Sequence, residues 1–592
     1  MISFKNKHHR RTSLTCCSVS AVLMGLTLLS SCSDWDDHFE ANKSATSTQS
    51  ETLMQNIEKN GELTQFADLL KKAGFDQNLS ASQTFTVWAP KDGTFDYNTL
   101  SGYSNDRLLR EFVENHVARN NYPVSGVIDQ NVYMLNEKRM HFSGASSYDI
   151  QGVKLSSYNL SSMNGTIHLI DGKIPYLSNI YESLNNYDFA LDSISSFIHS
   201  FDEKEIDEDK SERGPVVDGQ QTYLDTIYNE RNELLEDLYG VLINSEDSSY
   251  TMMMPTNTAW NKAMPTINSY FHYVPQFEYL TDIADKKTEI VKLKDAEAMR
   301  DSVSKVYMMA GLFYNNNLYD NGKLKTATDG ASLGCDSLMS TTGVKLYAED
   351  AANLLSNATR VNKSNGAIWV TDSLRIPTWS FWNPELRIEA ESNSLWGSYV
   401  NGTPNRVQVV QQNGEVKGSV SRNYFIEIEP SGSSVNPEMS FYLPNVRSAE
   451  YSVYVVFVPA NINSKTFAGN MKKNYLEFLI GYADSLGKSK EVSFGRFETN
   501  VDSLQNDPNG YISKLDTCYV GDMFFPMSYL GLSSGSTIYA PYLKVRSRVT
   551  SKQARENVYE RKMRIDCIIL RPKNLDAYLK EHPDYMYDKG LY

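Results

Sequence analysis

TFTVWAP at residues 84–90 and NGTIHLID at residues 164–171 are the two stretches that decide the fold of the first part of this chain. Both are rich in β-branched and aromatic residues, and the first ends at a proline, which is typical of β-strands. The Asn164-Gly165 pair before an alternating apolar run predicts a hairpin. Apolar residues at helical intervals between residues 53 and 70, closed by Gly74, predict a helical stretch before the first strand. The sequence therefore predicts a unit that combines sheet and helix.

The same pattern returns later in the chain. TMMMPTNTAW at residues 251–260 repeats the first strand and its turn, and NGAIWVTD at residues 365–372 repeats the closing strand. Self-similarity of this kind indicates a duplicated unit. In the second copy we expect Tyr314 and Trp369 to stand where two histidines of the first copy stand, and we expect a charged helical insertion over residues 286–306.

Five motifs in a fixed order make the first unit resemble a known family. An apolar helix is followed by TVWAP with Phe95, NHV at residues 115–117, LNEK at residues 135–138 and NGTIHLID. This order resembles the fasciclin (FAS1) domain, over residues 51–182 and, in divergent form, over residues 183–380. The resemblance implies β-wedges with helices on one side, and adhesion or protein and glycan contact rather than catalysis. His116 and His168 occupy fasciclin-like positions, and we expect them to be bonded to the backbone rather than to act as acid or base.

From residue 385 the sequence pattern changes to short alternating strands separated by Ser, Gly, Asn and Pro, which is typical of a sandwich or barrel. IEAE (388–391), YSVYVV (451–456) and RIDCIIL (564–570) resemble jelly-roll carbohydrate-binding modules over residues 385–573. The expected fold class is therefore multidomain, β-rich α+β: two fasciclin-like β-wedges with helices, then a jelly-roll β-sandwich. Residues 574–592 are expected to form a tail that docks as a helix or frays.

Two kinds of site are expected in the last unit. In jelly-roll modules the opening acidic residues and an aspartate of the last strand often hold a structural calcium ion. Glu389, Glu391 and Asp566 match those places, with solvent-facing carboxylates as the alternative, and no other cofactor is expected. Rings that stack on sugars are expected in loop-like stretches, although core packing is the alternative for each ring. The candidates are Trp396, Tyr399, Phe524, Phe525, Tyr529 and Tyr542.

The first 31 residues resemble the leader of a bacterial lipoprotein. Basic residues precede a short apolar run over residues 19–29, and LSSC ends at Cys32. The resemblance implies cleavage before Cys32 and a lipid anchor on its thiol; an ordinary leader with a chance cysteine is the alternative. The acidic cluster SDWDD at residues 33–37 resembles the surface-export signal of Bacteroidetes lipoproteins, or else simply begins the polar tether of residues 32–50. We therefore expect the chain on the outer membrane, facing the cell exterior.

Composition and motifs argue against several classes of function and site. A net charge of −15 and a pI near 5.2 argue against nucleic acid as a partner, since that surface demands basic residues. Beyond Cys32 only Cys335, Cys518 and Cys567 remain, without disulfide or zinc spacing. GLSSG at residues 531–535 fits G-x-S-x-G, but the proline-broken strand after it does not suit a nucleophile elbow.

The leading functional hypothesis is a non-enzymatic surface lipoprotein that binds glycan or protein. Such a protein would be accessory to nutrient capture or to a SusC/SusD-type uptake system, an association inferred from the lipoprotein type alone. The alternative is a cell or matrix adhesin that acts through the fasciclin-like domains. A hydrolase is the third option, because the many acidic residues leave room for a catalytic pair that nothing in the sequence singles out.

Overall fold

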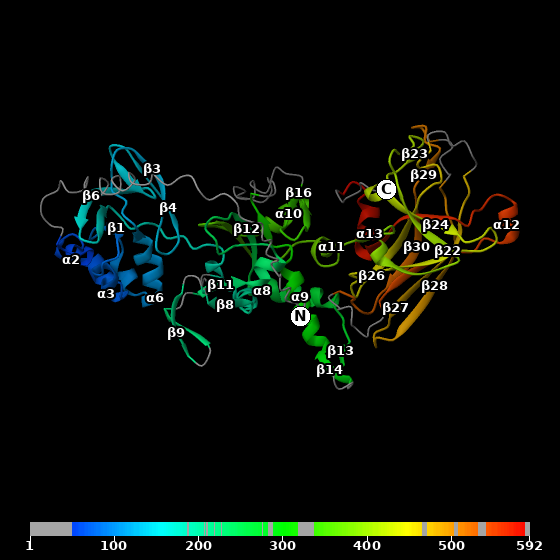
Figure 1. The fold of residues 1–592 in the computed structure, drawn as a ribbon. Coiled ribbons are helices and arrows are strands. Elements are labelled where there is room, and N and C mark those ends of the chain that lie inside the picture. Colours follow the sequence, from blue (N-terminus) through cyan, green and yellow to red (C-terminus); the bar gives the residue numbers. More distant parts are fainter. Residues whose placement is uncertain are drawn as a thin grey trace, which may run out of the picture.

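The computed structural model describes residues 50–185, 189–206, 208, 211–217, 220–225, 228–274, 276–281, 288–317, 337–464, 471–501, 507–530 and 540–585. Three units follow one another along the molecule, from the blue first unit to the yellow and red third unit (Figure 1). Cys32, Cys335 and residues 531–539 lie outside the described residues. In the part of the chain that the structure describes, no helix is long and apolar enough to cross a membrane.

The first unit is a sheet whose strand order is β2-β1-β7-β6-β5-β4-β3. Its strands are β1 (Phe85–Pro90), β2 (Val117–Arg119), β3 (Ile128–Tyr133), β4 (Arg139–Gly144), β5 (Tyr148–Ile150), β6 (Val153–Ser162) and β7 (Gly165–Ile170). Its helices are α2 (Leu53–Lys59), α3 (Thr64–Lys72), α4 (Asp76–Ser80), α5 (Tyr97–Ser101), α6 (Asn105–Leu108) and the π-helix η1 (Leu109–Val113).

Strand β1, which lies between β2 and β7, is buried on both faces, which explains its continuous apolar sequence. Val87 packs in the cluster that the helices cover, whereas the neighbouring Trp88 points to the other face and packs with Phe142 of β4. One apolar cluster therefore lies on each side of this sheet.

The predicted hairpin at Asn164-Gly165 is confirmed, and its geometry shows why these two residues are needed. The Asn164 side chain accepts a hydrogen bond from Leu53 N at 2.7 Å and donates to the carbonyls of Leu79 (2.9 Å) and Ala81 (2.7 Å). Gly165 has φ +149°, and a Cβ there would lie 1.9 Å from the carbonyl oxygen of Phe85. Only glycine therefore allows β7 to lie this close to β1.

The second unit repeats this arrangement in a sheet of order β15-β12-β19-β18. Phe85 pairs with Gly165 in the first unit, and Tyr250 pairs with Gly366 in the same parallel register in the second. Asn365 accepts from Ile180 N at 3.0 Å and donates to the carbonyls of Ile243 and Ser245. The elements are β12 (Tyr250–Pro255), β15 (Phe313–Asn315), β18 (Thr359–Lys363), β19 (Gly366–Thr371), α7 (Asp192–His199), η4 (Leu234–Leu238), α8 (Asn257–Ser269), α9 (Ala296–Met309), α10 (Ala348–Leu355), α11 (Thr378–Phe381) and the hairpin β16 (Ser337–Met339)–β17 (Lys345–Tyr347).

The strand register corrects one predicted equivalence. Trp88 pairs with His168 and Met253 pairs with Trp369, so Trp369 does stand in the place of His168. In contrast, Tyr314 pairs with Thr251 as Ala118 pairs with Thr86. Counting back two residues in each unit makes Leu312, and not Tyr314, the counterpart of His116. The sequence motif points to Tyr314 because of its aromatic ring. The strand register, which decides the equivalence, is visible only in the structure.

The charged insertion predicted as helix over residues 286–306 is helical only in its second part. Its first part forms β14 (Thr288–Lys294), which pairs with β13 (Gln276–Thr281) just before the insertion, and the second part belongs to α9. The sequence TEIVKLK of β14 alternates in polarity and contains β-branched residues, which favour a strand. Two further antiparallel pairs belong to this unit: β8 (Asp202–Ile206) with β11 (Tyr228–Asn232), and, between them in the chain, the hairpin of β9 (Glu212–Val217) and β10 (Gln220–Asp225).

The third unit is a β-sandwich. Sheet A has the order β22-β24-β32-β26-β30 with β20 added beside β32, and sheet B has the order β21-β25-β31-β27-β28. One apolar core cluster draws on both sheets, for example Ile426 of sheet A and Phe441 of sheet B. The strands are β20 (Leu386–Glu389), β21 (Trp396–Val400), β22 (Gly402–Gln408), β24 (Tyr424–Pro430), β25 (Glu438–Tyr442), β26 (Glu450–Phe457), β27 (Tyr475–Ala483), β28 (Ser489–Glu498), β30 (Asp516–Phe524), β31 (Tyr542–Ser547) and β32 (Met563–Pro572), with the short pair β23 (Val416–Lys417) and β29 (Ser513–Lys514).

The three units are joined by polar contacts. At the first junction the buried Lys138 donates to Glu182 at 2.8 Å and to Glu246 at 2.6 Å. At the second junction the Tyr273 hydroxyl donates to the carbonyl of Leu530 at 2.9 Å. The tail docks as helix α13 (Lys573–Glu581), which follows β32 directly; helix α12 (Ser551–Arg555) lies at the far end of the sandwich (Figure 1).

Candidate functional site

The three carboxylates predicted to hold calcium do come together at the edge of the sandwich. Glu389 ends β20, Glu391 follows two residues later, and Asp566 lies on the paired strand β32, where its carbonyl accepts from Ala390 N at 3.0 Å. Their exposures are 8%, 6% and 0% respectively. Ser421 joins two of them, because its N–H donates to Asp566 Oδ1 at 3.0 Å and its hydroxyl donates to Glu389 Oε1 at 2.8 Å.

The carboxylate cluster is buried, and its negative charges are poorly compensated. Burial and the neighbouring Glu389 and Glu391 raise the pKa of Asp566 to about 7, and burial also raises the pKa of Glu391. One oxygen each of Glu389 and Glu391 is buried without a hydrogen-bond partner among the described residues. Arg422 approaches Glu389 at 3.5 Å, but its side chain is 74% exposed and is screened by solvent.

Hard oxygen donors with two orphaned oxygens fit the chemistry of Ca²⁺. As the side chains stand, however, no group of three or more His, Cys, Asp or Glu in the described part of the chain could hold a metal ion. The cluster therefore has the kind of donor that calcium takes, but its side chains, as they stand, do not form a metal site.

The six predicted aromatic residues do not form one surface. Phe525 is 2% exposed and packs in the sandwich core, so its ring is unavailable to a ligand. Trp396 is partly buried and donates to the carbonyl of Ala390 at 2.7 Å. Tyr399 (53% exposed) lies on sheet B, whereas Phe524 (59% exposed) ends β30 of sheet A. Tyr399 and Phe524 are therefore exposed, but they lie on different sheets and do not form one surface.

Of the remaining candidates, Tyr529 packs against the sandwich core, and Tyr542 lies on the outer face of sheet B. Tyr542 of β31 lies directly opposite Tyr442 of β25, which is 43% exposed. A Cβ on Gly481 would lie 2.3 Å from the Tyr542 ring, so the glycine lets that ring lie close over β27. The Tyr542 hydroxyl donates to Glu491 at 2.6 Å, and Tyr529 lies near the pair.

We call Tyr442 and Tyr542 the tyrosine pair. Charged groups surround it, including the ion pair of Lys544 with Glu491 at 2.9 Å. Rings beside charged hydrogen-bonding groups are the chemistry that stacks on a sugar and binds its hydroxyls. Sequence reasoning missed Tyr442, although the alternation in EMSFY predicts that Glu438, Ser440 and Tyr442 share the outer face.

His116 and His168 of the first unit are buried and bonded to the backbone through both ring nitrogens, which confirms the expectation for them. His116 Nδ1 lies 2.6 Å from the carbonyl of Phe112, and its Nε2 accepts from Ile174 N at 2.8 Å. His168 Nε2 lies 2.9 Å from the carbonyl of Tyr122, and its Nδ1 accepts from Asn159 N at 3.3 Å. Burial lowers the pKa of both rings to about 4.

The described cysteines carry no disulfide. Cys518 lies on β30 and Cys567 on β32, and β26 separates the two strands. Burial raises the pKa of Cys518 to about 12 and that of Cys567 well above its usual value. Neither thiol is therefore prepared to act as a nucleophile at neutral pH.

Comparison with a family model identifies the first unit. Residues 61–174 match the model of the fasciclin domain. This part of the chain is a fasciclin domain. The match begins just before α3 and contains β1 to β7, and so it includes His116, His168 and the Asn164 hairpin.

Solved structures give weaker likenesses. A FAS1 domain pair from the insect cell adhesion molecule fasciclin I is 12% identical, with 55% of this chain and 99% of that chain covered and a TM-score of 0.18. A Paenibacillus xanthan lyase is 13% identical over 37% of this chain and 18% of that chain, with a TM-score of 0.18. An α-L-fucosidase from Vibrio sp. strain EJY3 is 12% identical over 32% and 36%, with a TM-score of 0.13. No curated protein sequence matches the chain.

These TM-scores are too low to transfer an activity to this chain. The likeness of the second unit to the first is shown by its own geometry, since its Asn365-Gly366 turn and strand register repeat those of the fasciclin domain. It has lost both buried histidines, whose places are taken by Leu312 and Trp369. The two units thus share the strand register and the asparagine of the turn, but not the two buried histidines.

Proposed function

We propose that this chain is a non-enzymatic adhesion protein of the cell surface, with two fasciclin-like units and a jelly-roll sandwich carried on a lipid anchor at Cys32. The match of residues 61–174 to the fasciclin domain carries this proposal. Of the two roles expected from the sequence, adhesion is the one that this family supports. The anchor and the acidic residues after it would place the body outside the outer membrane.

A strip of exposed apolar side chains on the fasciclin domain supports a contact role. Tyr158 and Leu160 on β6 are 48% and 38% exposed, and Met163 in the following turn is 57% exposed. We call these three residues the β6 strip. We infer that these exposed apolar side chains contact a partner.

An attachment assay tests this role. Beads coated with the full chain should attach to immobilised collagen, fibronectin or mucin, and a variant with serine at all three β6 strip positions should attach less. Val410→Ser is the matched control, since Val410 is 84% exposed but belongs to the sandwich. Equal attachment of the wild type, the β6 strip variant and the control would refute the assignment of contact to this surface.

A second role, glycan capture by the sandwich, is favoured by the tyrosine pair. Loss of one stacking ring costs about 1 kcal/mol, so Tyr542→Ala should weaken binding to a glycan array roughly fivefold. Tyr399→Ala, an exposed tyrosine of the same sheet outside the pair, is the control. Wild-type binding that survives Tyr542→Ala but not Tyr399→Ala would move the site away from the pair.

A place beside a SusC/SusD-type uptake complex remains compatible with the lipoprotein leader, and co-purification of a transporter from membranes would support it. The absence of catalysis is tested separately. Turnover of polysaccharide or peptide by the purified chain, abolished by neutralising a single acidic residue, would overturn the non-enzymatic proposal.

A further inference from the structure

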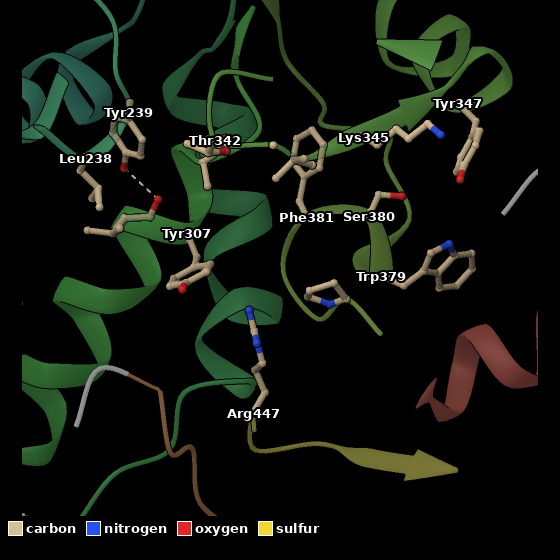
Figure 2. Close-up of a pocket in the computed structure, with 15 residues that line it drawn as sticks. Leu238, Tyr239, Tyr307, Thr342, Lys345, Tyr347, Trp379, Ser380, Phe381 and Arg447 are labelled. Carbon is tan, nitrogen blue, oxygen red and sulfur yellow. Dashed lines mark hydrogen bonds between the residues drawn. The ribbon is translucent and has the colours of Figure 1, made fainter. Parts of the chain in front are cut away.

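A hollow of about 450 Å³ lies where the second unit meets the sandwich, and neither role proposed above uses it. Its walls come from η4, α9, the β16–β17 turn and α11 of the second unit, and from the loop between β25 and β26 of the sandwich. Figure 2 shows the side chains that line it. This volume lies within the range of about 300–1,000 Å³ that is usual for small-molecule sites.

Arg447 is the feature of this hollow that needs an explanation. Its side chain is 4% exposed and points from its loop toward Tyr307 (Figure 2). Nη1 donates to the carbonyl of Asn445 at 2.6 Å and Nε donates to the carbonyl of Trp382 at 3.3 Å. Both partners are neutral, and no carboxylate pairs with Arg447 among the described residues.

A buried guanidinium without a counter-ion is unfavourable, because desolvation is not offset by an opposite charge. The walls offer none, since no Asp or Glu is among the described residues that line the hollow, and Lys345 adds a second cation. This concentration of positive charge stands out in a chain of net charge −15. It fits an anion, and a planar guanidinium held by two backbone carbonyls suits a carboxylate best.

The other walls indicate what the carboxylate is attached to. The Tyr307 ring lies 5.3 Å from the Arg447 guanidinium, and its hydroxyl has no hydrogen-bond partner in the described part of the chain. Trp379 and Ser380 of α11 and Thr342 of the β16–β17 turn also line the hollow. Aromatic rings and hydroxyls around a cation are the groups that recognise a sugar ring bearing an acid.

We propose that this hollow binds a uronic acid, with the carboxylate on Arg447. Arg447 comes from the sandwich, whereas Tyr307 and Ser380, which also line the hollow, come from the second unit. The ligand would therefore contact both units and hold them together. This site is independent of the β6 strip and of the tyrosine pair, so its failure would leave the adhesion proposal intact.

Titration calorimetry on the full chain tests the assignment, with D-glucuronate as the probe and D-glucose as its neutral counterpart. Glucuronate should bind at least about tenfold more tightly than glucose, since charge-assisted hydrogen bonds separate the two sugars. Arg447→Gln should weaken glucuronate binding about tenfold or more, and Arg555→Gln, on the distant α12, should not change it. Binding of oligogalacturonate would indicate that the hollow takes the end of an acidic polysaccharide. Binding of glucuronate alone would indicate that it takes a free uronic acid.

Arg447→Gln removes hydrogen bonds to two carbonyls and could loosen the junction. The exposed Lys345 provides a second variant, because Lys345→Gln removes a charge from the rim without touching the core, and it should weaken binding several-fold. Absence of glucuronate binding, equal binding of glucose, or unchanged affinity in both variants would overturn the proposal.

Discussion

Acidification from about pH 7.5 to about pH 5 should destabilise the fasciclin domain through His116 and His168. Each ring uses one nitrogen to accept a backbone N–H, so a proton can be added only by breaking that bond. The pKa of each ring is about 4 in the folded domain and about 6.5 in the unfolded chain, so unfolding at intermediate pH takes up protons. The stabilisation is complete above about pH 6.5 and is lost as the pH falls toward 4.

The magnitude follows from the two pKa values. At about pH 5 each histidine costs about 2 kcal/mol relative to neutral pH, and the two together cost about 4 kcal/mol if they act independently. This is a large share of the roughly 5–15 kcal/mol that stabilises a typical domain. In the second unit the corresponding residues, Leu312 and Trp369, do not titrate in this range.

Hydrogen exchange measured by mass spectrometry resolves the units within the full chain. After correction for the intrinsic exchange rate, protection of β1 and β7 should fall between the two pH values by more than protection of β12 and β19. His116→Leu, which copies the second unit, should weaken the domain at neutral pH by about 1–3 kcal/mol but halve its pH dependence. Equal pH dependence of the two units, or an unchanged dependence in His116→Leu, would refute this reasoning.

Three further perturbations test the structure. Gly165→Ala should cost at least about 2 kcal/mol in a denaturant titration, because its Cβ would overlap the Phe85 carbonyl, whereas Gly61→Ala, with open space around it, should be nearly neutral. Calcium at about 100 times its Kd should raise the Tm of the sandwich by several degrees in scanning calorimetry; Asp566→Asn should abolish the rise, and an unchanged wild-type Tm would exclude the site. Lys138→Met should leave Glu182 and Glu246 buried without their cation and loosen the first junction by about 3 kcal/mol, seen as a wider particle in small-angle scattering; an unchanged profile would contradict this.

Local turn chemistry made much of the fold predictable. Asn164-Gly165 and Asn365-Gly366 predicted two equivalent hairpins. The asparagine side chain bonds backbone groups beside the turn, and the missing Cβ lets the parallel strand lie close. The alternating strands after residue 385 likewise predicted a sandwich. What failed was register: Tyr314 was matched to a histidine by its position in a motif, whereas pairing with Thr251 decides its place.

Side-chain sites depended on contacts that the sequence does not contain. Glu389 and Asp566 could be matched through a resemblance to a fold. Phe524 and Phe525 are neighbours in the sequence, but the first is 59% exposed and the second is packed in the core. Arg447 gave no signal at all. Its role depends on side chains of α9 and α11 that only the docking of two units brings to it.

The central claim is that the fasciclin domain makes adhesive contact at the cell surface. The most direct measurement is the attachment of bacterial cells that display the intact chain to surfaces coated with matrix protein or mucin. We expect firm attachment with the wild-type chain and a clear loss when Tyr158, Leu160 and Met163 are all serine, at equal surface amounts of protein. Attachment that is the same with both chains, or the same without the chain, would contradict it.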